Sequence, residues 1–525
     1  MSPTREIGGR MQVALSVADF LNRAALVYGH RAAVVDEPSA PGALGRLSYV
    51  EMEARARGMA LGLDDLGVEH GERVAIVSPN SARFLTSFFG VSGYGRILVP
   101  INFRLTSDEI AYIVGHSGAS VLLYDPDLDD QVAGIKVAHR FRLDGTEDAG
   151  LFAPAPEGAE PRPWAPDEEA TCSVNYTSGT TARPKGVQLT HRNCWLNAAV
   201  FGWHVGVSDR DVLLHTLPMF HCNGWGMPYA VTGMGGGHVV LRKIDGEEIL
   251  SRIESEGVTL LCCAPAVVAA VLSAAEARAQ AGRAVPGRGT VRITVAGAPP
   301  PSKTIERVDT ELGWEFIQIY GLTETSPLLT INRAPGEWDD LDASSRSQLL
   351  SRAGVPAVGV QMAVDEEGEV LARANHVFAG YWEQPEETAK ALAGGWFHTG
   401  DGGYLDSAYL TISDRKKDVI ITGGENVSSI EVEDCLYQHP AVAEVAVIGV
   451  PDEKWGETIK ALVVVRDGSA VSEAELIAHC RERLAHFKAP TSVELRPALD
   501  RTATGKLQKY KLRQPYWSGQ ERQVN

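Results

Sequence analysis

Cysteine is scarce in this sequence, and long apolar runs are missing. The seven cysteines form no CxxC pair, so neither a disulfide frame nor a cysteine-rich metal site is expected, and the odd count suits a reducing compartment. No stretch reaches the roughly 18 apolar residues that a membrane-spanning helix needs. Near the N-terminus, Asp19, Asn22 and Arg23 interrupt the apolar part, which argues against a signal peptide. We therefore expect a cytoplasmic protein.

Positive charge is also in short supply. The chain has 49 Lys and Arg against 67 Asp and Glu, which gives a formal net charge of −18. Nucleic-acid binding depends mainly on basic side chains that neutralise phosphates, so a nucleic-acid partner is not expected. The acidity does not exclude a nucleotide, because a few local cations and oriented backbone N–H groups can hold phosphate.

The length of the chain, 525 residues, predicts more than one domain. Short apolar runs such as Arg73–Val77 and Val258–Leu261 alternate with amphipathic stretches such as Tyr49–Leu66. This alternation predicts an α/β protein with parallel sheets covered on both faces. The five consecutive charged residues of Asp414–Asp418 mark a change in the sequence pattern. The compact stretch that follows them predicts a second, smaller domain.

That second domain has its own pattern of elements. We expect a helix at about 430–438, strands at Glu444–Val450 and Ala461–Val465, and a helix at about 473–487.

The most unusual segment is Tyr176–Gly186. It follows a predicted strand, Thr171–Tyr176, and leads through Val187–Thr190 to a predicted helix near Asn193. Its four hydroxyl side chains, two glycines and one lysine suit a polyphosphate. The spacing does not match a Walker A loop, so an ordinary kinase or GTPase is not indicated. Taken by itself, such a cluster is also explained as a solvent-exposed turn.

The full string resembles the phosphate loop of the acyl-adenylate-forming superfamily, which contains acyl-CoA synthetases, luciferases and peptide-synthetase adenylation domains. Further strings resemble the same superfamily in the same order: Pro218–Trp225, Val295–Pro299, Gln318–Glu324, Trp396–Asp401, Ser413–Asp418, Ile421–Val427 and Arg501–Lys506. Together they span about residues 15–515. Two positions depart from the pattern, since Ala182 replaces a usual Gly and Asp500 a usual Pro.

The resemblance implies a site for ATP. The implied phosphate contacts are Thr177, Ser178, Gly179, Thr180, Thr181 and Lys185. The implied adenine pocket consists of Gly297, Ala298, Pro299, Gln318, Tyr320, Gly321 and Thr323, with Tyr320 against one face of the purine. Asp401 would accept the ribose hydroxyls, and Arg415 would be a second ribose or phosphate contact.

The resemblance also implies a metal site and an acid site. Glu324, with Thr177 as a second contact, would bind Mg²⁺, which prefers hard oxygen ligands. His221 would lie beside the substrate carboxylate, with Trp225 and Gly321 lining the same site. Outside this context, His221 is better explained as a core histidine, and Glu324 as a solvent-exposed residue of a turn.

Three further roles follow from the resemblance and concern the C-terminal part. Lys506 would bridge the α-phosphate and the attacking carboxylate oxygen. Gly423 and Gly424 would line the tunnel for the pantetheine arm of coenzyme A, and Lys417 would be the hinge. The implied fold is a large N-terminal domain, residues 1–414, of αβαβα layers with a small β-barrel. A small mobile α+β domain, residues 415–525, completes it.

The function implied is that of an acid–CoA ligase with ATP, Mg²⁺ and coenzyme A. The stretch Met219–Tyr229 resembles bacterial medium- and long-chain fatty acyl-CoA synthetases, whereas Cys262–Ala266 departs from the common pocket-wall pattern. A fatty acid, an aryl acid and a pathway-specific acid therefore stay open. So do transfer of the activated acid to an acceptor other than coenzyme A, a non-catalytic ATP-binding relative, and a homodimer.

Overall fold

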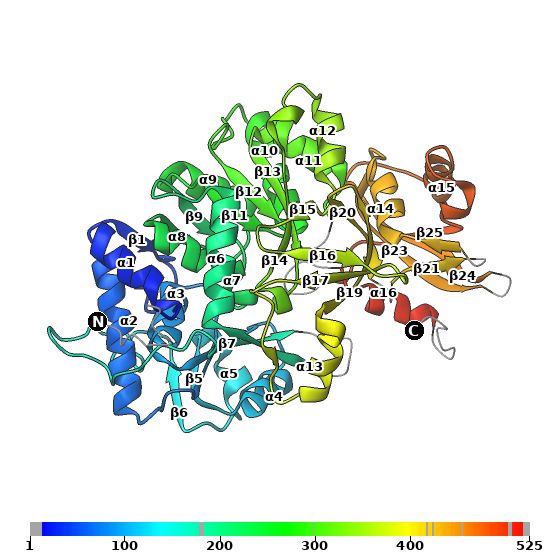
Figure 1. Cartoon of the computed structure of the whole chain (residues 1–525). Coiled ribbons are helices and arrows are strands. Elements are labelled where there is room, and N and C mark those ends of the chain that lie inside the picture. The colour runs from blue at the N-terminus through cyan, green and yellow to red at the C-terminus, as the bar shows by residue number, and fades with distance from the viewer. Residues whose placement is uncertain are drawn as a thin grey trace.

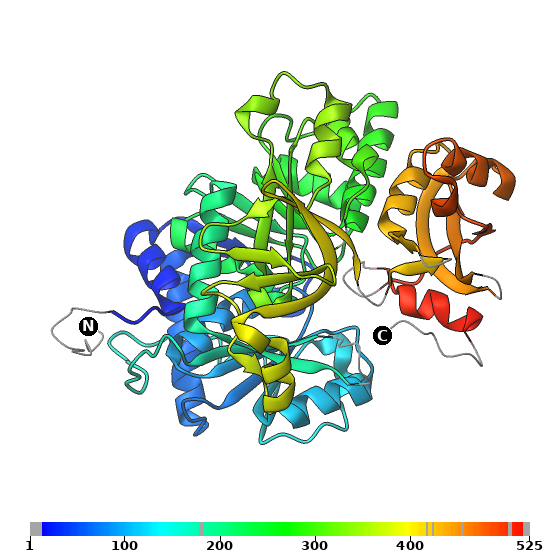
Figure 2. The ribbon, with the colours of Figure 1, turned by 45° about the vertical axis from the view of Figure 1, so that its right-hand side comes forward.

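The computed structural model describes residues 13–177, 183–297, 299–415, 418–422, 425–452, 455–501 and 507–517. Figures 1 and 2 show a large body, which holds the chain up to strand β20 (Tyr409–Arg415), and a smaller lobe, which holds the rest. No helix of the described ranges is long and apolar enough to cross a membrane.

A seven-stranded sheet forms the lower part of the large body in Figure 1. In order across the sheet, its strands are β18 (Gly380–Tyr381), β8 (Lys185–Thr190), β7 (Thr171–Thr177), β4 (Ile97–Ile101), β3 (Arg73–Val77), β5 (Ala119–Tyr124) and β6 (His139–Arg142). The pairs from β7 to β6 are parallel, whereas β8 and β18 are antiparallel additions at one edge. Strands β3 and β4 are almost entirely buried, as their near-continuous apolar sequences predict.

A nine-stranded sheet forms the upper part of the body. In order across the sheet, its strands are β15 (Val355–Pro356), β14 (Leu328–Arg333), β13 (Glu315–Gly321), β12 (Arg292–Val295), β11 (Leu260–Cys263), β9 (Val212–His215), β10 (Gly237–Val240), β1 (Ala32–Val35) and β2 (Arg46–Ser48). Its central pairs are parallel, and β2, β14 and β15 run antiparallel at the two edges.

Helices cover these sheets. They are α1 (Ala18–Tyr28), α2 (Tyr49–Asp65), α3 (Ala82–Gly90), α4 (Ser107–Ser117), α5 (Asp129–Val132), α6 (His191–Val205), α7 (Cys222–Trp225), α8 (Met227–Met234), α9 (Gly246–Glu256), α10 (Pro265–Gln280), α11 (Ser302–Arg307), α12 (Ala343–Leu350) and α13 (Pro385–Ala391). Helix α6 contacts β8 of one sheet and β14 of the other, so it packs between the two. One buried apolar cluster includes residues of both sheets and of α6, which makes the two halves a single body.

Local sequence explains where α6 begins and ends. The Thr190 hydroxyl accepts a hydrogen bond from the Asn193 N–H (3.1 Å), and the Asn193 side chain accepts one from the Thr190 N–H (3.0 Å). At the other end, Gly206 takes the left-handed conformation that ends many helices (φ 74°).

A four-stranded antiparallel sheet follows the large sheets, in the order β16 (Gln361–Val364), β17 (Glu369–Arg373), β19 (Phe397–Asp406) and β20. It occupies the place where the family resemblance implied a small β-barrel. A backbone bridge between Gly354 and Leu410 joins β20 to the segment before β15, so the sheet is tied to the edge of the nine-stranded sheet.

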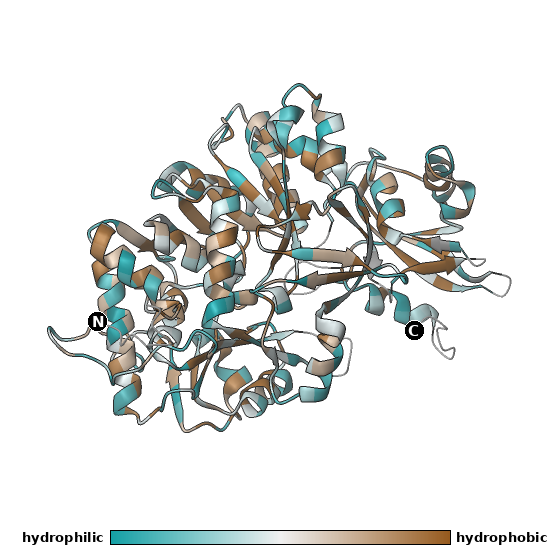
Figure 3. Ribbon diagram, in the orientation of Figure 1, coloured by the Kyte–Doolittle hydropathy of each residue, from teal (hydrophilic) through white to brown (hydrophobic). Residues whose placement is uncertain are grey.

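The smaller lobe has a mixed sheet and its own apolar core. Its elements are β21 (Ile420–Thr422), β22 (Glu425–Val427), α14 (Ser429–Tyr437), β23 (Val442–Asp452), β24 (Gly456–Val465), α15 (Glu473–Arg481), β25 (Ser492–Leu495) and α16 (Lys509–Arg513). Val432, Leu436, Val447 and Leu476 are among the residues of that core. Figure 3 shows apolar residues concentrated along β23 and β24 and polar ones on outward-facing helices.

The predicted fold class is confirmed, with a large α/β part and a smaller α+β part. Two local predictions differ from the structure: the strand predicted at Val258–Leu261 begins at Leu260, and the helix predicted at 473–487 ends at Arg481. The helix predicted near Asn193 is present as α6. Val187–Thr190, for which no element was predicted, belongs to β8, which pairs with β7 and β18.

Candidate functional site

Two residues predicted to bind the nucleoside meet across two different sheets. Tyr320 lies in β13 and Asp401 in β19, and the Tyr320 hydroxyl donates a hydrogen bond of 2.9 Å to Oδ2 of Asp401. Asp401 is buried, and its backbone N–H donates to the Thr399 hydroxyl (3.1 Å). The ring expected against the purine and the carboxylate expected on the ribose therefore lie next to each other.

Lys185 and Glu324 come together around Tyr381. The Tyr381 hydroxyl donates to Oε1 of Glu324 at 2.9 Å, and the Lys185 ammonium lies 4.9 Å from the centre of the Tyr381 ring. Lys185 also forms an ion pair with Glu387 of α13. Burial raises the pKa of the Tyr381 hydroxyl far above its usual range, and the adjacent Glu324 carboxylate adds to the effect, so Tyr381 stays protonated and donates.

Thr177 lies opposite Lys185 in the β7–β8 hairpin, since the two residues pair across the strands. The hairpin therefore holds one predicted metal contact and the predicted phosphate-binding lysine at the same end. The short turn Thr323–Thr325, which carries Glu324, packs against β8. Together these contacts place hydroxyl, ammonium and carboxylate groups at one end of the seven-stranded sheet.

Gln318 offers an acceptor suited to a purine. It is buried, and its Oε1 atom has no hydrogen-bond partner among the described residues. A buried amide oxygen without a hydrogen-bond donor destabilises the fold, so a ligand group that donates a hydrogen bond would be favoured there. The exocyclic amino group of adenine is such a donor. Gln318 pairs with Val295 across β13 and β12, and Gly297, which follows β12, has a φ of 99°, a conformation that favours glycine.

Gly321 is required by a close backbone approach. A Cβ atom at this position would lie 1.6 Å from the Pro327 carbonyl oxygen, so any side chain would displace the loop that follows. The loop contains Thr323 and Glu324. The predicted role of Gly321 in both the adenine and acid sites is thus accompanied by a structural role that shapes the Glu324 turn.

The acid side is built by the segment after β9. His221 is half-buried and precedes a short left-handed turn, while Trp225 is buried in the core that joins the two sheets. Asn223 makes side-chain hydrogen bonds to Ser173 and Asn175 of β7. Sequence reasoning did not identify these polar partners, because isolated Ser and Asn residues in a strand carry no recognisable signal.

Several predicted residues lie outside the described part of the chain, and they are Ser178, Gly179, Thr180, Thr181, Ala182, Ala298, Lys417, Gly423, Gly424 and Lys506. Arg415 ends β20, with its backbone opposite Asp401. Pro299 follows β12 and is half-buried. Asp500 is exposed, and backbone pairing of Arg501 with Leu507 closes the ends of the Lys506 segment.

Mg²⁺ can be tested against the groups that are present. No cluster of three or more His, Cys, Asp and Glu side chains that could hold a metal ion exists within the described ranges. Mg²⁺ is commonly held by one or two carboxylates together with substrate phosphates and waters, so a single carboxylate such as Glu324 fits this ion. The residues are not those of a closed zinc or calcium site.

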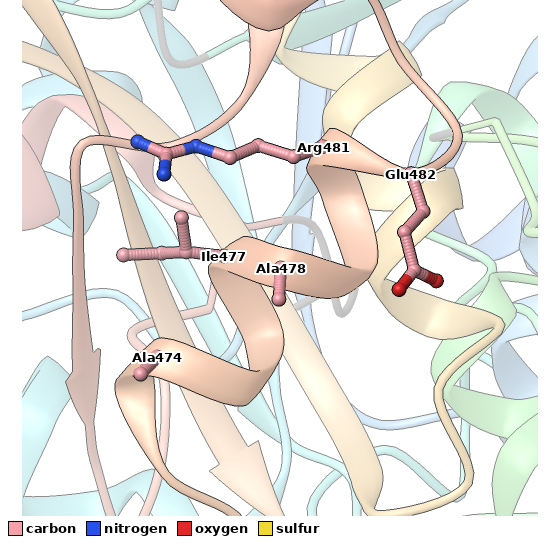
Figure 4. Close-up of a pocket in the computed structure, with 5 residues that line it drawn as sticks. All are labelled: Ala474, Ile477, Ala478, Arg481 and Glu482. Atoms are coloured by element: carbon pink, nitrogen blue, oxygen red, sulfur yellow. The ribbon is translucent and has the colours of Figure 1, made fainter.

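Two further features are a surface depression and the contact between the two lobes. A surface depression on α15 is lined by Ala474, Ile477, Ala478, Arg481 and Glu482, and the two charged side chains point to opposite sides (Figure 4). Nothing there converges on a ligand. The smaller lobe meets the large body near the predicted adenine pocket, where the Ser302 N–H donates to Oδ1 of Asp434 at 3.0 Å.

Comparisons with known proteins agree with this arrangement. The model of the AMP-binding enzyme family matches residues 21–382, and that of the AMP-binding enzyme C-terminal domain matches residues 431–506. The chain is 36% identical to 4-hydroxybutyrate–CoA ligase 2 of Metallosphaera sedula, over 94% of this chain and 93% of the relative. It is 36% identical to 2-methylpropanoate–CoA ligase CCL4 of Humulus lupulus, over 95% and 94%.

Solved structures give the same result. The anthranilate CoA ligase AuaEII, in complex with anthranoyl-AMP, matches with a TM-score of 0.85 at 27% identity, over 96% of this chain and 98% of that one. The Lys185–Tyr381–Glu324 contacts and Tyr320 lie within the span of the larger family model, whereas Asp401, the partner of Tyr320, lies between the two matched spans. The chain therefore belongs to the AMP-binding enzyme family, part of the acyl-CoA ligase superfamily of adenylate-forming enzymes.

Proposed function

We propose that this protein is a carboxylic acid–CoA ligase. It transfers the adenylyl group of ATP to a carboxylate with release of pyrophosphate, and then transfers the acyl group of this acyl-AMP to the thiol of coenzyme A with release of AMP. The observation that carries the proposal is the convergence of Lys185 and Glu324 on Tyr381, at one end of the hairpin that contains Thr177. A lysine, a hydroxyl and a carboxylate at one place suit a triphosphate with its metal ion.

The first half-reaction has to bring two anions together, the acid carboxylate and the α-phosphate. Preorganised positive groups are the usual answer to such repulsion. Lys185 and the hairpin N–H groups would hold the phosphates, and Lys506 would bridge the α-phosphate and the attacking oxygen. His221 would orient the carboxylate. Mg²⁺ held by Glu324 and Thr177 would neutralise phosphate charge.

Recognition of the nucleoside would use the pair on the other side of the site. Asp401 would give up its hydrogen bond from the Tyr320 hydroxyl and accept hydrogen bonds from the ribose hydroxyls instead. Arg415 would be a further contact. Gln318 would accept a hydrogen bond from the adenine amino group, and the backbone of 297–299 would cover the purine.

The second half-reaction needs space for a thiol where Lys506 had been. We infer that residues 415–525 rotate as a unit against residues 1–414 about a hinge at Lys417. Gly423 and Gly424 would then line the pantetheine tunnel. The separate apolar core of the smaller lobe supports a rigid unit that is able to move.

We propose a fatty or aryl acid as the substrate. Relatives named for 4-hydroxybutyrate and 2-methylpropanoate, and a structural neighbour with anthranoyl-AMP, support small acids of both kinds. The buried cysteines support a reducing, cytoplasmic location. A homodimer is a further expectation that sedimentation would test.

The decisive experiment measures pyrophosphate and AMP release over a panel of short hydroxy and branched acids, medium-chain fatty acids and aryl acids, each with and without coenzyme A. AMP release that requires coenzyme A for one acid class supports the ligase and identifies the acid. Pyrophosphate release that coenzyme A does not change would favour another acceptor, our second candidate. No release with any acid contradicts both.

A further inference from the structure

The segment after His221 is a full turn of left-handed helix. Five consecutive residues have positive φ angles, namely Cys222 (47°), Asn223 (50°), Gly224 (58°), Trp225 (61°) and Gly226 (75°). For each non-glycine residue this conformation is less favourable than the right-handed one. Such a turn persists only where the surrounding structure holds it.

Asn223 holds the middle of the turn. Its Oδ1 atom accepts a hydrogen bond from Nδ2 of Asn175 (3.0 Å), and its own Nδ2 donates to the Ser173 hydroxyl oxygen (2.8 Å). All three side chains are buried. Because a buried amide left without hydrogen-bond partners destabilises the fold, these contacts favour one placement of the turn against β7. Asparagine is also among the residues that tolerate this conformation best.

Asn197 of α6 holds the end of the turn. Its Nδ2 atom donates to the Trp225 carbonyl (3.1 Å), and its Oδ1 accepts from the Leu328 N–H (3.1 Å). Asn197 is fully buried. A Cβ atom on Gly226 would lie 2.5 Å from the Asn197 amide nitrogen, so glycine is needed for this close approach.

The two asparagines therefore join three segments of the candidate site. Strand β7 runs directly into Thr177 and the phosphate hairpin, Leu328 follows the turn that carries Glu324, and the left-handed turn follows His221. The buried hydrogen bonds of these two asparagines together reach all three segments.

We propose that Asn223 and Asn197 are positioning residues for adenylation. They fix the His221–Trp225 segment against the strand that leads into the phosphate hairpin, and so set the approach of the carboxylate to the α-phosphate. This inference rests on the proposed function. Misplacement of the reacting groups by about 1 Å typically lowers the rate about 10²-fold. Loss of these hydrogen bonds is therefore expected to slow adenylation strongly.

The test compares Asn223→Gly with wild type in acid-dependent ATP–pyrophosphate exchange. Glycine accepts the positive φ and removes both hydrogen bonds, so it changes the anchoring of the turn and leaves its conformation accessible. We expect kcat for exchange to fall about 10–100-fold and KM for the acid to rise, with KM for ATP within about twofold of wild type.

Asn332→Ala is the matched control. Asn332 is also buried, and its amide donates to the carbonyls of Leu349 (2.8 Å) and Arg352 (3.0 Å), away from the His221 and Glu324 segments. Because Asn332 pairs with Gln318 across β13 and β14, the control is read in kcat and in KM for the acid at saturating ATP. Its loss should lower the melting temperature and leave these two values unchanged below the melting range. Asn223→Asp adds a second readout. Its carboxyl can donate only when protonated, so its activity relative to wild type should rise as the pH falls.

The outcomes separate the two proposals. Wild-type protein without acid-dependent exchange contradicts the proposed function itself. Wild-type exchange with Asn223→Gly no more impaired than Asn332→Ala contradicts the positioning role and leaves the ligase proposal intact. A shared fall in melting temperature with a kinetic defect in Asn223→Gly alone supports the inference.

Discussion

The two sides of the candidate site are held in different ways. On the acid side, the amide groups of Asn223 and Asn197 are buried and bonded to a neighbouring strand and to backbone groups. On the nucleotide side, side chains pair with one another, as Lys185–Glu387, Glu324–Tyr381 and Tyr320–Asp401. The Lys185 and Glu387 side chains are 18% and 45% exposed.

This difference has an energetic meaning. Breaking a buried amide network leaves unsatisfied groups at about 1–3 kcal/mol each, so the acid side has one stable arrangement. Exposed ion pairs are worth about 0–1 kcal/mol, so a polyphosphate can replace Glu387 on Lys185 at little cost. We propose that the predicted acid side is preorganised, whereas the predicted nucleotide side exchanges internal partners for ligand. Four predictions test the comparison.

The largest effect is expected from Lys506→Ala, which belongs to neither side. Loss of this charge should reduce acid-dependent pyrophosphate release by about 10²–10³-fold, because the lysine offsets repulsion between carboxylate and α-phosphate. Thioester formation from supplied acyl-adenylate should be retained, and single-turnover assays of each half-reaction measure both values. Equal loss of the two would contradict rotation of the smaller lobe.

Glu324→Gln and Tyr381→Phe separate a ligand contact from its exchangeable partner. The Gln variant should lose about 10²-fold in pyrophosphate release because the phosphate charge is less well neutralised. The Phe variant should lose less than about tenfold, the value of one hydrogen bond. Magnesium titrations of both variants are the measurement. Similar losses in the two variants would show that Tyr381 is a fixed part of the site. They would contradict the proposed exchange of internal partners for ligand on the nucleotide side.

The buried start of α6, the helix that carries Asn197, should respond to acid. Burial lowers the pKa of His191, the first residue of α6, to about 4, and the Val17 N–H donates to its Nδ1 atom (3.3 Å). The unfolded chain takes up this proton near pH 6.5, so the free energy of unfolding should fall as the pH falls from about 6.5 to about 4. The slope is about 1.4 kcal/mol per pH unit for one proton. Urea unfolding over this range measures it.

His191→Gln should reduce that slope by about one proton. His215, whose pKa burial lowers to about 3, keeps part of the dependence in this variant. An unchanged slope in His191→Gln would mean that His191 is not the group that titrates.

The smallest effect is expected from Glu387→Gln. The hydrogen bond from Lys185 lowers the pKa of Glu387, so this carboxylate is charged near neutral pH and competes with phosphate for the lysine. Removing the charge should lower KM for ATP about two- to fivefold, with kcat unchanged. Glu386→Gln, on the exposed face of the same helix, is the control. A higher KM for ATP in the Glu387 variant would instead make Glu387 a support for Lys185.

Much of this architecture could be predicted from the sequence. The strand at Arg73–Val77 and the helix begun at Tyr49 were predicted from periodicity, and both are present. Lys185, Glu324, Tyr320 and Asp401 were predicted from motif resemblance, and the structure brings them together in pairs. No element was predicted at β8, which is short and pairs with the adjacent β7 and, at its other edge, with β18 far along the chain. Tyr381 and Glu387 were not predicted, because they reach Lys185 only when these distant segments dock against β8.

By itself, the sequence determined the α/β class, the order of the motifs and the residue types available for phosphate, ribose and metal, since these depend on local pattern and on chemical identity. The tertiary structure decided which of those groups meet. Lys185 and Glu324 share Tyr381 because β18 docks on β8. The left-handed turn after His221 exists because asparagines from distant segments hold it. A conformation that is locally unfavourable cannot be inferred from local preference, because the contacts that stabilise it come from elsewhere in the chain.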